Sequence, residues 1–148
     1  MSSDPVVIVA AKRTAIGAFS GSLSTLSAVE IGTVAVKAVL AESGVSPNDV
    51  DEVILGQVLT AGVGQNPARQ TAIKSGIPAD KTAMTINQVC GSGLRAVALG
   101  LQSITAGDAS IVVAGGQESM TQSPHCLHLR SGTNMGNADV VDTRIRDG

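Results

Sequence analysis

Residues 87–96 read Asn-Gln-Val-Cys-Gly-Ser-Gly-Leu-Arg-Ala, and this stretch decides the fold because it joins a strand-like run to a long helix. The run from Thr82 to Asn87 leads into Cys90, and two glycines and a serine follow before the helix. This order predicts a thiol beside the first unpaired N–H groups of a helix. Those groups and the aligned peptide dipoles favour negative charge by roughly 0.3–2 kcal/mol. We therefore expect Cys90 to react as a thiolate nucleophile.

The glycines on either side of residue 92 favour this reactive interpretation of Cys90. Gly91 and Gly93 have no side chains, so a substrate can approach the sulfur and the neighbouring backbone closely. The alternative is a buried and inert cysteine at a helix start, which is a common setting for cysteine. Ser92 is expected to cap the helix and not to act as a nucleophile, because the residue at the turn is the cysteine.

Strand-like and helix-like segments alternate along the chain, which predicts an α/β fold with a mostly parallel sheet. The expected strands are Val6–Ala10, Val53–Gln57, Thr82–Asn87 and Ile111–Ala114. A capping box of Ser27 and Glu30 opens the first helix, which Gly44 ends, and Ser46-Pro47 predicts a short helical turn. Asn66 and Pro67 start a second helix, which Gly76 closes.

The helix after Cys90 differs from the others in its pattern. From Leu94 to Ala106 it is apolar almost all round, and Arg95, Gln102 and Ser103 are its conspicuous polar residues. A helix that is apolar on every face is normally buried. The pattern therefore predicts a central helix, buried between two layers, that carries the nucleophile at its tip.

Composition excludes several classes of partner. The chain of 148 residues is 43% hydrophobic, 15% charged and 1% aromatic, so the core must be built from aliphatic side chains. A net charge of −2 gives no electrostatic reason to bind nucleic acid or an anionic membrane. We find no run of roughly 18 apolar residues, and residues 1–5 lack the basic segment of a signal peptide. We therefore expect a cytoplasmic protein without a disulfide between Cys90 and Cys126.

Four segments carry a resemblance to a known family. Residues 87–96 resemble the nucleophile segment of thiolases, the acyl-CoA C-acyltransferases. Residues 8–17 are similar to the opening strand and loop of that family, and residues 64–70 to a segment near its dimer interface. Residues 114–120 resemble the strand end that leads into the thiolase loop domain. The resemblance is strongest to the biosynthetic, acetoacetyl-CoA-forming kind, and it extends from Val6 to the last residue.

The resemblance implies a thiolase-like layered fold. Residues 1–118 would form the N-terminal half-domain without its fifth strand, and residues 119–148 the beginning of the loop domain, with the hairpin that mediates tetramer assembly. Cys90 would take an acyl group from acetyl-CoA or acetoacetyl-CoA as a thioester, with its own backbone N–H as one oxyanion donor. The acyl group would pass to a second acetyl-CoA or, in reverse, to free coenzyme A. Coenzyme A is then a substrate and not a bound cofactor.

The chain is shorter than the family it resembles. Thiolases are more than twice this length, with two similar halves, and their catalytic histidine, second cysteine, Asn-bound water and most CoA contacts lie past the position of residue 148. We therefore expect the chain to be a piece of a longer or nicked polypeptide, or to pair with a second polypeptide, in a dimer or tetramer. Alone it should condense acetyl-CoA negligibly, with an open strand edge and one open face of the central helix.

Two other functions remain open from the sequence. A decarboxylating ketoacyl-ACP synthase shares the fold and the cysteine nucleophile, although the residues after Cys90 favour a thiolase. A non-catalytic assembly fragment would keep the dimer and tetramer surfaces without a working site, and the early stop at Gly148 is the feature that supports it.

The remaining motifs favour structural roles. The glycine loop at 62–67 has proline where a dinucleotide loop has its third glycine, so we expect a turn. The His125-Cys126-x-His128 spacing fits no common zinc pattern, so we expect no metal there. Cys126 is expected to be a packed, unreactive thiol. Because His125 and His128 match the assembly hairpin of the thiolase loop domain, the resemblance implies that neither replaces the catalytic histidine. We expect Glu118 to make structural hydrogen bonds and not to act as a general base. We expect the acidic cluster of residues 49, 51 and 52 to lie at a solvated helix end; its members are Asp49, Asp51 and Glu52.

Overall fold

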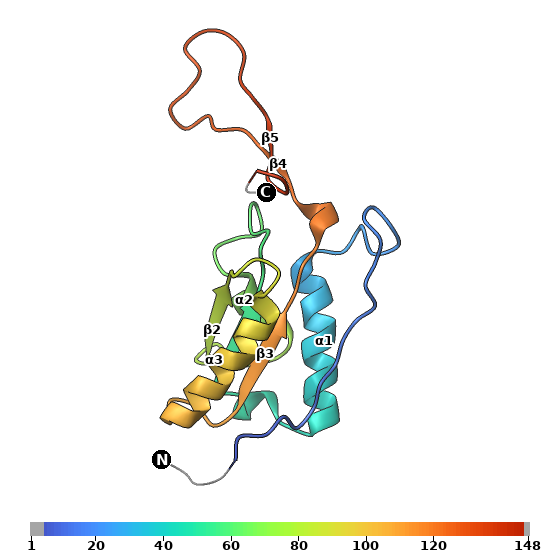
Figure 1. The fold of residues 1–148 in the computed structure, drawn as a ribbon, viewed down its shortest axis with the longest axis vertical. Helices are drawn as coiled ribbons and strands as arrows, with labels where there is room; N and C mark the ends of the chain where they lie inside the picture. Colours follow the sequence, from blue (N-terminus) through green and yellow to red (C-terminus); the bar gives the residue numbers. More distant parts are fainter. Residues whose placement is uncertain (1–4, 147–148) are drawn as a thin grey trace.

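The computed structural model describes residues 5–146. The predicted absence of a signal peptide concerns residues 1–5, of which only Pro5 lies in this range. The chain end at Gly148 lies outside it. The elements follow in the order α1 (Ala28–Ser43), η1 (Pro47–Asp49), β1 (Glu52–Gly56), α2 (Pro67–Lys74), β2 (Thr82–Ile86), α3 (Ser92–Ala106), β3 (Val112–Gly116), η2 (Met120–Gln122), β4 (His125–Cys126) and β5 (Val141–Asp142). Figure 1 shows α3 in front of the sheet and α2 behind it.

The predicted parallel sheet is confirmed. It has the strand order β2-β1-β3, and both outer strands run parallel to β1, with Glu52 opposite Thr82 on one side and Val112 on the other. Because all three strands point the same way, their carboxyl ends lie at one edge. The predicted strand bounds at these three places agree with the structure to within two residues.

The core lies between β1 and the helices α1 and α2. Val53 and Leu55 of β1 belong to one buried cluster with α1 and α2 residues such as Leu40 and Ala72. Ile54 points to the opposite face, toward α3, and is only 1% exposed. A central parallel strand covered on both faces explains why β1 reads as a continuous apolar run. The sheet is thus sandwiched between two helical layers.

The helix ends also follow the sequence signals. Ser27 and Glu30 form both halves of the capping box at the start of α1, and Gly44 ends that helix in the left-handed region with φ of 70°. The Asn66 side chain accepts from the Arg69 N–H at the start of α2, with Pro67 at the first helical position. These predictions are confirmed.

The prediction of a strand at Val6–Ala10 is wrong for the described chain. The segment is extended but forms no ladder, and Ile8 and Val9 are 78% and 69% exposed. It runs past α1, where Lys12 pairs with Glu42 (Figure 1). A strand needs a neighbour to satisfy its backbone groups, and among residues 5–146 the sheet stops at β3. The apolar run indicated burial but could not indicate the missing neighbour.

Burial of every face of α3 is likewise not observed. Ser92, Ala96 and Gly100 are buried toward the sheet. Leu94 is 79% exposed and Leu101 is 51% exposed, because no second layer covers the far side of α3 in the described range. The companion expectation, that one face of this helix lies open in the chain alone, agrees with the structure.

After β3 the chain leaves the sheet. Figure 1 shows η2 leading away from the helices to β4 and β5, with a long loop beyond them. His125 pairs with Asp142 in this short antiparallel ladder, and the Arg144 guanidinium lies 4.4 Å from the centre of the Phe19 ring. The division of the chain at residues 118 and 119 stays a prediction. Across residues 5–146, every helix is too short or too polar to cross a membrane.

Helix α3 begins directly on the strand ends, which is possible because those ends are glycines. A Cβ atom on Gly56 would lie 2.5 Å from the Ser92 Cβ and 2.6 Å from the Ser92 carbonyl carbon. Gly116 is in register with Gly56, and a Cβ atom on Gly116 would lie 3.3 Å from the Gly93 Cα. The start of α3, at Ser92 and Gly93, is therefore held against the backbone of β1 and β3.

We expect Gly56→Ala to lower the free energy of unfolding by about 1–3 kcal/mol, because the new methyl group meets helix backbone that cannot move aside. Gly115→Ala is the matched control in β3, since its Cβ would lie 3.9 Å from Leu55 Cδ2, an ordinary contact. Urea denaturation measures both variants. Equal destabilisation by the two substitutions would show that the approach of α3 to Gly56 is not the constraint.

Candidate active site

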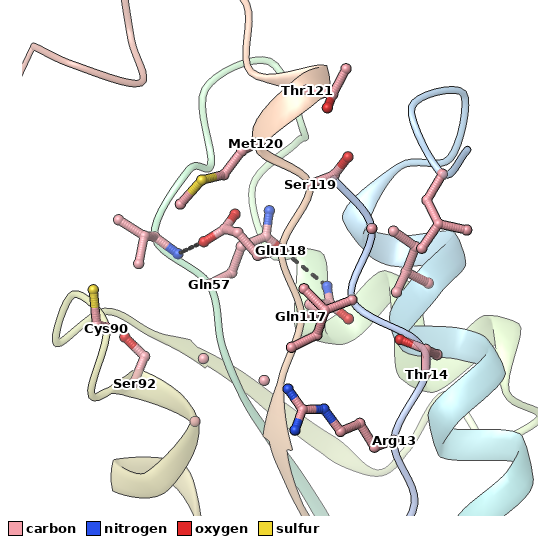
Figure 2. Close-up of a pocket in the computed structure, with 18 of the residues that line it drawn as sticks. Arg13, Thr14, Gln57, Cys90, Ser92, Gln117, Glu118, Ser119, Met120 and Thr121 are labelled. Atoms are coloured by element: carbon pink, nitrogen blue, oxygen red, sulfur yellow. Dashed lines mark hydrogen bonds between the residues drawn. The ribbon is translucent and has the colours of Figure 1, made fainter. Parts of the chain in front are cut away.

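The turn between β2 and α3 presents Cys90 to solvent. Cys90 is exposed and its thiol is free. In Figure 2 the sulfur points away from α3, into the space in front of Glu118 and Met120. The predicted position of the thiol, at a strand-to-helix turn next to the start of a long helix, is therefore confirmed. The catalytic role of Cys90 is not shown by this position and is taken up below.

Val89 gives this turn its unusual backbone. Its φ is 49°, in the left-handed region that a β-branched residue rarely adopts. The Val89 N–H donates to Asn87 Oδ1 at 2.9 Å, and the Val89 carbonyl accepts from Ser92 Oγ at 2.6 Å. Strain of this kind persists only when surrounding bonds fix the residue, and it gathers at functional sites.

Ser92 holds the turn and does not cap the helix. The cap position belongs to Gly91, which makes no side-chain cap bond, so the predicted capping role is wrong. Ser92 is the first residue of α3, and its hydroxyl accepts from the Gln88 N–H at 2.8 Å while it donates to Val89. The prediction that Ser92 has a structural role is consistent with these bonds, although the bonds are made to the loop and not to the helix.

The backbone N–H of Cys90 is the one N–H between residues 88 and 92 that takes no part in the hydrogen bonds of the turn. They use the N–H groups of Gln88, Val89, Gly91 and Ser92, whereas the Cys90 N–H takes part in none of them. A donor beside the sulfur with no partner in the turn suits the predicted oxyanion role. That role stays a prediction.

A cleft of about 530 Å³ opens in front of the thiol. Most of its walls come from four parts of the chain: the segment 13–19, the end of β1 with the loop that follows, the Cys90 turn with the start of α3, and residues 116–121. Leu23 and Ile31 complete the lining. Figure 2 shows Arg13 and Thr14 on the wall opposite Cys90, with Gln117 and Glu118 between them. The volume lies in the range of small-molecule sites, and segments far apart in sequence meet there.

Two buried glutamines form the floor behind this cleft, and the sequence analysis did not identify them. Thr71 Oγ1 donates to Gln117 Oε1 at 2.7 Å, Gln117 Nε2 donates to Gln57 Oε1 at 2.9 Å, and Gln57 Nε2 donates to the Leu59 carbonyl at 2.9 Å. Gly32 of α1 leaves the space that Gln117 occupies. A buried polar network with its partners in place fixes the strand ends in one arrangement.

A signal for these glutamines was present in the sequence. Both β1 and β3 end at a glycine that a glutamine follows, at residues 56–57 and 116–117, and the two glycines lie opposite each other in the sheet. Two parallel strands that end in the same polar pair place their amides side by side. The repeated dipeptide could therefore have predicted the pairing.

Glu118 makes the structural hydrogen bonds that were expected of it. Its Oε2 accepts from the Val58 N–H at 2.8 Å, and its two carboxyl oxygens accept from the Leu59 N–H at 3.3 and 3.4 Å. Partial burial raises the pKa of the Glu118 carboxyl, and these backbone donors oppose the rise. Glu118 thus ties the end of β3 to the loop after β1.

The acidic cluster is less solvated than expected. Asp49 is exposed, but Asp51 Oδ2 accepts from the Ser110 and Ile111 N–H groups at 2.8 and 3.0 Å, which lowers the pKa of Asp51. Glu52 Oε2 accepts from the Ser103 hydroxyl at 3.1 Å. Two of the three carboxylates therefore fasten the start of β1, Asp51 to the α3–β3 connection and Glu52 to α3 itself. The sequence pattern could not show these partners, since they lie more than fifty residues away.

The other residues singled out lie outside the cleft. His125 Nε2 is 3.9 Å from Asp142 Oδ2, and Cys126 is half-buried in β4. In the part of the chain that the structure describes, His, Cys, Asp and Glu side chains form no group of three or more suited to a metal. Gly62 and Gly64 both have positive φ, and Gln70 Nε2 donates to the Val63 carbonyl at 2.7 Å, as in a structural turn.

Residues 6–148 match a protein family described as the N-terminal domain of thiolase. Acetyl-CoA acetyltransferase of Rhizobium meliloti is 58% identical over 148 residues, and that of Allochromatium vinosum is 62% identical over 147. A probable acetyl-CoA acetyltransferase of Escherichia coli K12 is 57% identical over 144 residues. These alignments cover 100%, 99% and 97% of this chain but 38%, 37% and 37% of the relatives. The chain thus spans less than two fifths of their length.

We expect Val89→Gly to raise the free energy of unfolding by about 1 kcal/mol. Glycine removes the strain of the left-handed backbone, which is about 1–3 kcal/mol. Its greater conformational freedom in the unfolded chain reduces this gain in stability by about 0.5–1 kcal/mol. Val89→Ala is the control, because it keeps a Cβ atom at the same φ. Urea denaturation of both variants tests this, and a Val89→Gly protein less stable than Val89→Ala would contradict the strain.

The raised pKa of Glu118 predicts how stability changes with pH. The folded state binds this proton more tightly than the unfolded state, so the associated stability is present below the ordinary pKa of 4.5 and is lost as pH rises through the folded pKa. Glu118→Gln removes this loss. From about pH 4 to about pH 7, its stability relative to the parent protein should rise.

Glu30→Gln is the control with the opposite sign. Bonds from Ser27 lower the pKa of the Glu30 carboxyl, so its contribution is present above the unfolded pKa and is lost as pH falls. Relative to the parent protein, this variant should lose stability over the same rise in pH. Urea denaturation at several pH values gives both slopes, and slopes of the same sign would contradict the assignment for Glu118.

Proposed function

Because the chain belongs to the thiolase family through its N-terminal domain, we propose that Cys90 is the nucleophile of an acetyl-CoA C-acetyltransferase. The observation that carries the proposal is the free, exposed Cys90 thiol on a strained turn at the start of α3, facing a cleft of about 530 Å³. The names of the relatives support the choice of acetyl-CoA as substrate.

The first step is acylation of the enzyme. In synthesis the Cys90 thiolate attacks the thioester carbonyl carbon of acetyl-CoA, and in breakdown it attacks the ketone carbon of acetoacetyl-CoA; in each case a bond forms between that carbon and Sγ. In synthesis the carbon–sulfur bond to coenzyme A then breaks, and the released thiolate takes up a proton. In breakdown the carbon–carbon bond next to the attacked ketone carbon breaks, and the released acetyl-CoA carbanion takes up a proton. The Cys90 N–H stabilises the oxyanion formed between these events, and one such donor accounts for about 2.7–4 kcal/mol of the barrier.

The second step transfers the acyl group. In synthesis, a base removes a proton from the methyl carbon of a second acetyl-CoA, and that carbon attacks the acyl-Cys90 carbonyl and releases the Cys90 thiolate. In breakdown, the thiolate of coenzyme A attacks instead. Glu118 is not proposed as the base, because its carboxyl accepts two backbone bonds. We propose that the base and the second oxyanion donor come from the second thiolase half.

The proposal extends to partners and assembly. The exposed face of α3, with Leu94 and Leu101, would be covered by that second half or by a second polypeptide carrying it. Residues 119–148 would begin the loop domain and contribute to a dimer or tetramer, and coenzyme A would be a substrate without a metal. The open face of α3 also favours a second candidate function, a non-catalytic assembly module.

Acetyl transfer to the sulfur tests the proposal. Incubated with acetoacetyl-CoA or acetyl-CoA, the protein as produced by its natural gene should gain one acetyl group on the peptide containing Cys90, as measured by mass spectrometry. Cys90→Ala should abolish this label, and Cys126→Ala, the matched cysteine variant, should keep it. A label that survives Cys90→Ala would remove Cys90 from its role.

Thiolysis of acetoacetyl-CoA separates the two candidates. An acetyltransferase should cleave acetoacetyl-CoA with coenzyme A, and a preparation containing residues 1–148 alone should be slower by at least about 10²–10³, the effect of losing one oxyanion donor. Ordinary thiolase rates from residues 1–148 alone would contradict the need for a second half. A protein that assembles but never takes an acetyl group would be an assembly module.

A further inference from the structure

A continuous path of hydrogen bonds leads from Glu118 to the turn that carries Cys90. The Glu118 carboxyl holds the Val58 N–H at 2.8 Å, which Figure 2 shows as a dashed line. The carbonyl of the same residue accepts from Asn87 Nδ2 at 3.5 Å, and Asn87 Oδ1 accepts from the Val89 N–H at 2.9 Å. Val89 is the strained residue next to Cys90. The path therefore ends on the backbone that aims the sulfur.

We propose that Asn87 and Glu118 are positioning residues that hold the Cys90 turn in its reactive geometry, an inference that rests on the nucleophilic role of Cys90. Neither side chain is proposed to touch the reacting atoms. Asn87 fixes Val89 by one bond and fixes itself to the β1 loop by another. Glu118 keeps that loop where Asn87 can reach it.

The turn depends on such bonds because packing does not hold it. Asn87, Val89 and Cys90 are all exposed, and Val89 is 60% exposed. A left-handed valine without close packing needs other restraints to persist. Ser92 restrains it from the helix side, and Asn87 restrains it from the strand side.

Asparagine suits position 87 because the two hydrogen bonds made there require a donor and an acceptor on one short side chain. The Oδ1 atom receives the Val89 N–H, and the Nδ2 atom donates to the Val58 carbonyl. Aspartate would keep the acceptor, but it would turn a second oxygen toward the Val58 carbonyl. Asn87→Asp therefore breaks the path at a single link.

Glu118 can be tested apart from the fold because a separate set of bonds holds the strands. Beneath it, the Gln57 N–H donates to the Ile86 carbonyl at 3.0 Å and the Gln117 N–H donates to the Gly56 carbonyl at 2.9 Å. These bonds continue the sheet past its last residues. Glu118→Gln replaces one of the two acceptor oxygens with an NH2 group, so a single uncharged oxygen is left for the Val58 and Leu59 N–H groups. This loosens the loop and leaves the sheet joined.

The experiment is a double-mutant cycle on the protein as produced by its natural gene. Asn87→Asp, Glu118→Gln and the double variant are compared by the rate of Cys90 alkylation with iodoacetamide and by kcat and KM for acetoacetyl-CoA thiolysis. Each single variant should change the alkylation rate several-fold and lower kcat by roughly 10–100-fold with KM nearly unchanged, as expected for misplacement of about 1 Å. The double variant should resemble the single variants, because both cut the same path.

Ser103→Ala is the matched control, because it removes a hydrogen bond at the far end of α3, where Ser103 donates to Glu52. It should lower stability and leave Cys90 alkylation unchanged. Circular dichroism establishes that each variant is folded before its rates are compared.

Wild-type alkylation rates in the folded single variants would overturn the proposal. So would effects that simply add in the double variant, because two independent sites give additive free energies. If the parent protein is alkylated at Cys90 but takes no acetyl group from acetyl-CoA, the proposed function fails. The alkylation cycle would still decide whether Asn87 and Glu118 hold the turn.

Discussion

Direct contact between helix backbone and strand backbone positions everything else around Cys90. The first residues of α3 sit on Gly56 and Gly116: a methyl group on Gly56 would clash with Ser92, and one on Gly116 would lie only 3.3 Å from the Gly93 Cα. Because α3 cannot be lifted from the sheet without losing this contact, the turn before it is confined to a few residues. The left-handed Val89 is a consequence, since the chain must reverse sharply between Ile86 and Ser92. Ser92 and Asn87 then secure what the contact imposes.

Local sequence signals predicted a large part of this fold. The capping box at Ser27 and Glu30, the Asn66-Pro67 start and the glycine at residue 44 each act through neighbouring backbone, so they could be recognised one segment at a time. The position of Cys90 was predictable for the same reason, because a strand, a cysteine and two glycines precede one long apolar helix. The family resemblance is confirmed by the match over residues 6–148.

What the sequence did not predict depends on partners far along the chain. The apolar run at 6–10 and the outer face of α3 indicate burial, but neither pattern says which segment would cover them. Asp51 and Glu52 read as solvated because their donors, Ser110, Ile111 and Ser103, lie elsewhere in the sequence. The pairing of Gln57 with Gln117 was readable only by comparing two strand ends. Asn87 belongs to the motif at residues 87–96, but its bond to the Val58 carbonyl reaches a loop far away in the sequence, so the motif alone could not predict it.

The buried amide network has a consequence for how this sequence can change over time. Gln117 fills the space beside Gly32, accepts a hydrogen bond from the Thr71 hydroxyl and donates one to Gln57, so four segments share one set of contacts. A larger residue at position 32 would require a shorter side chain at position 117. The Thr71 hydroxyl would then lose its hydrogen-bond acceptor. Substitutions at these positions are therefore accepted or rejected together, and drift at any one of them is restrained by the other three.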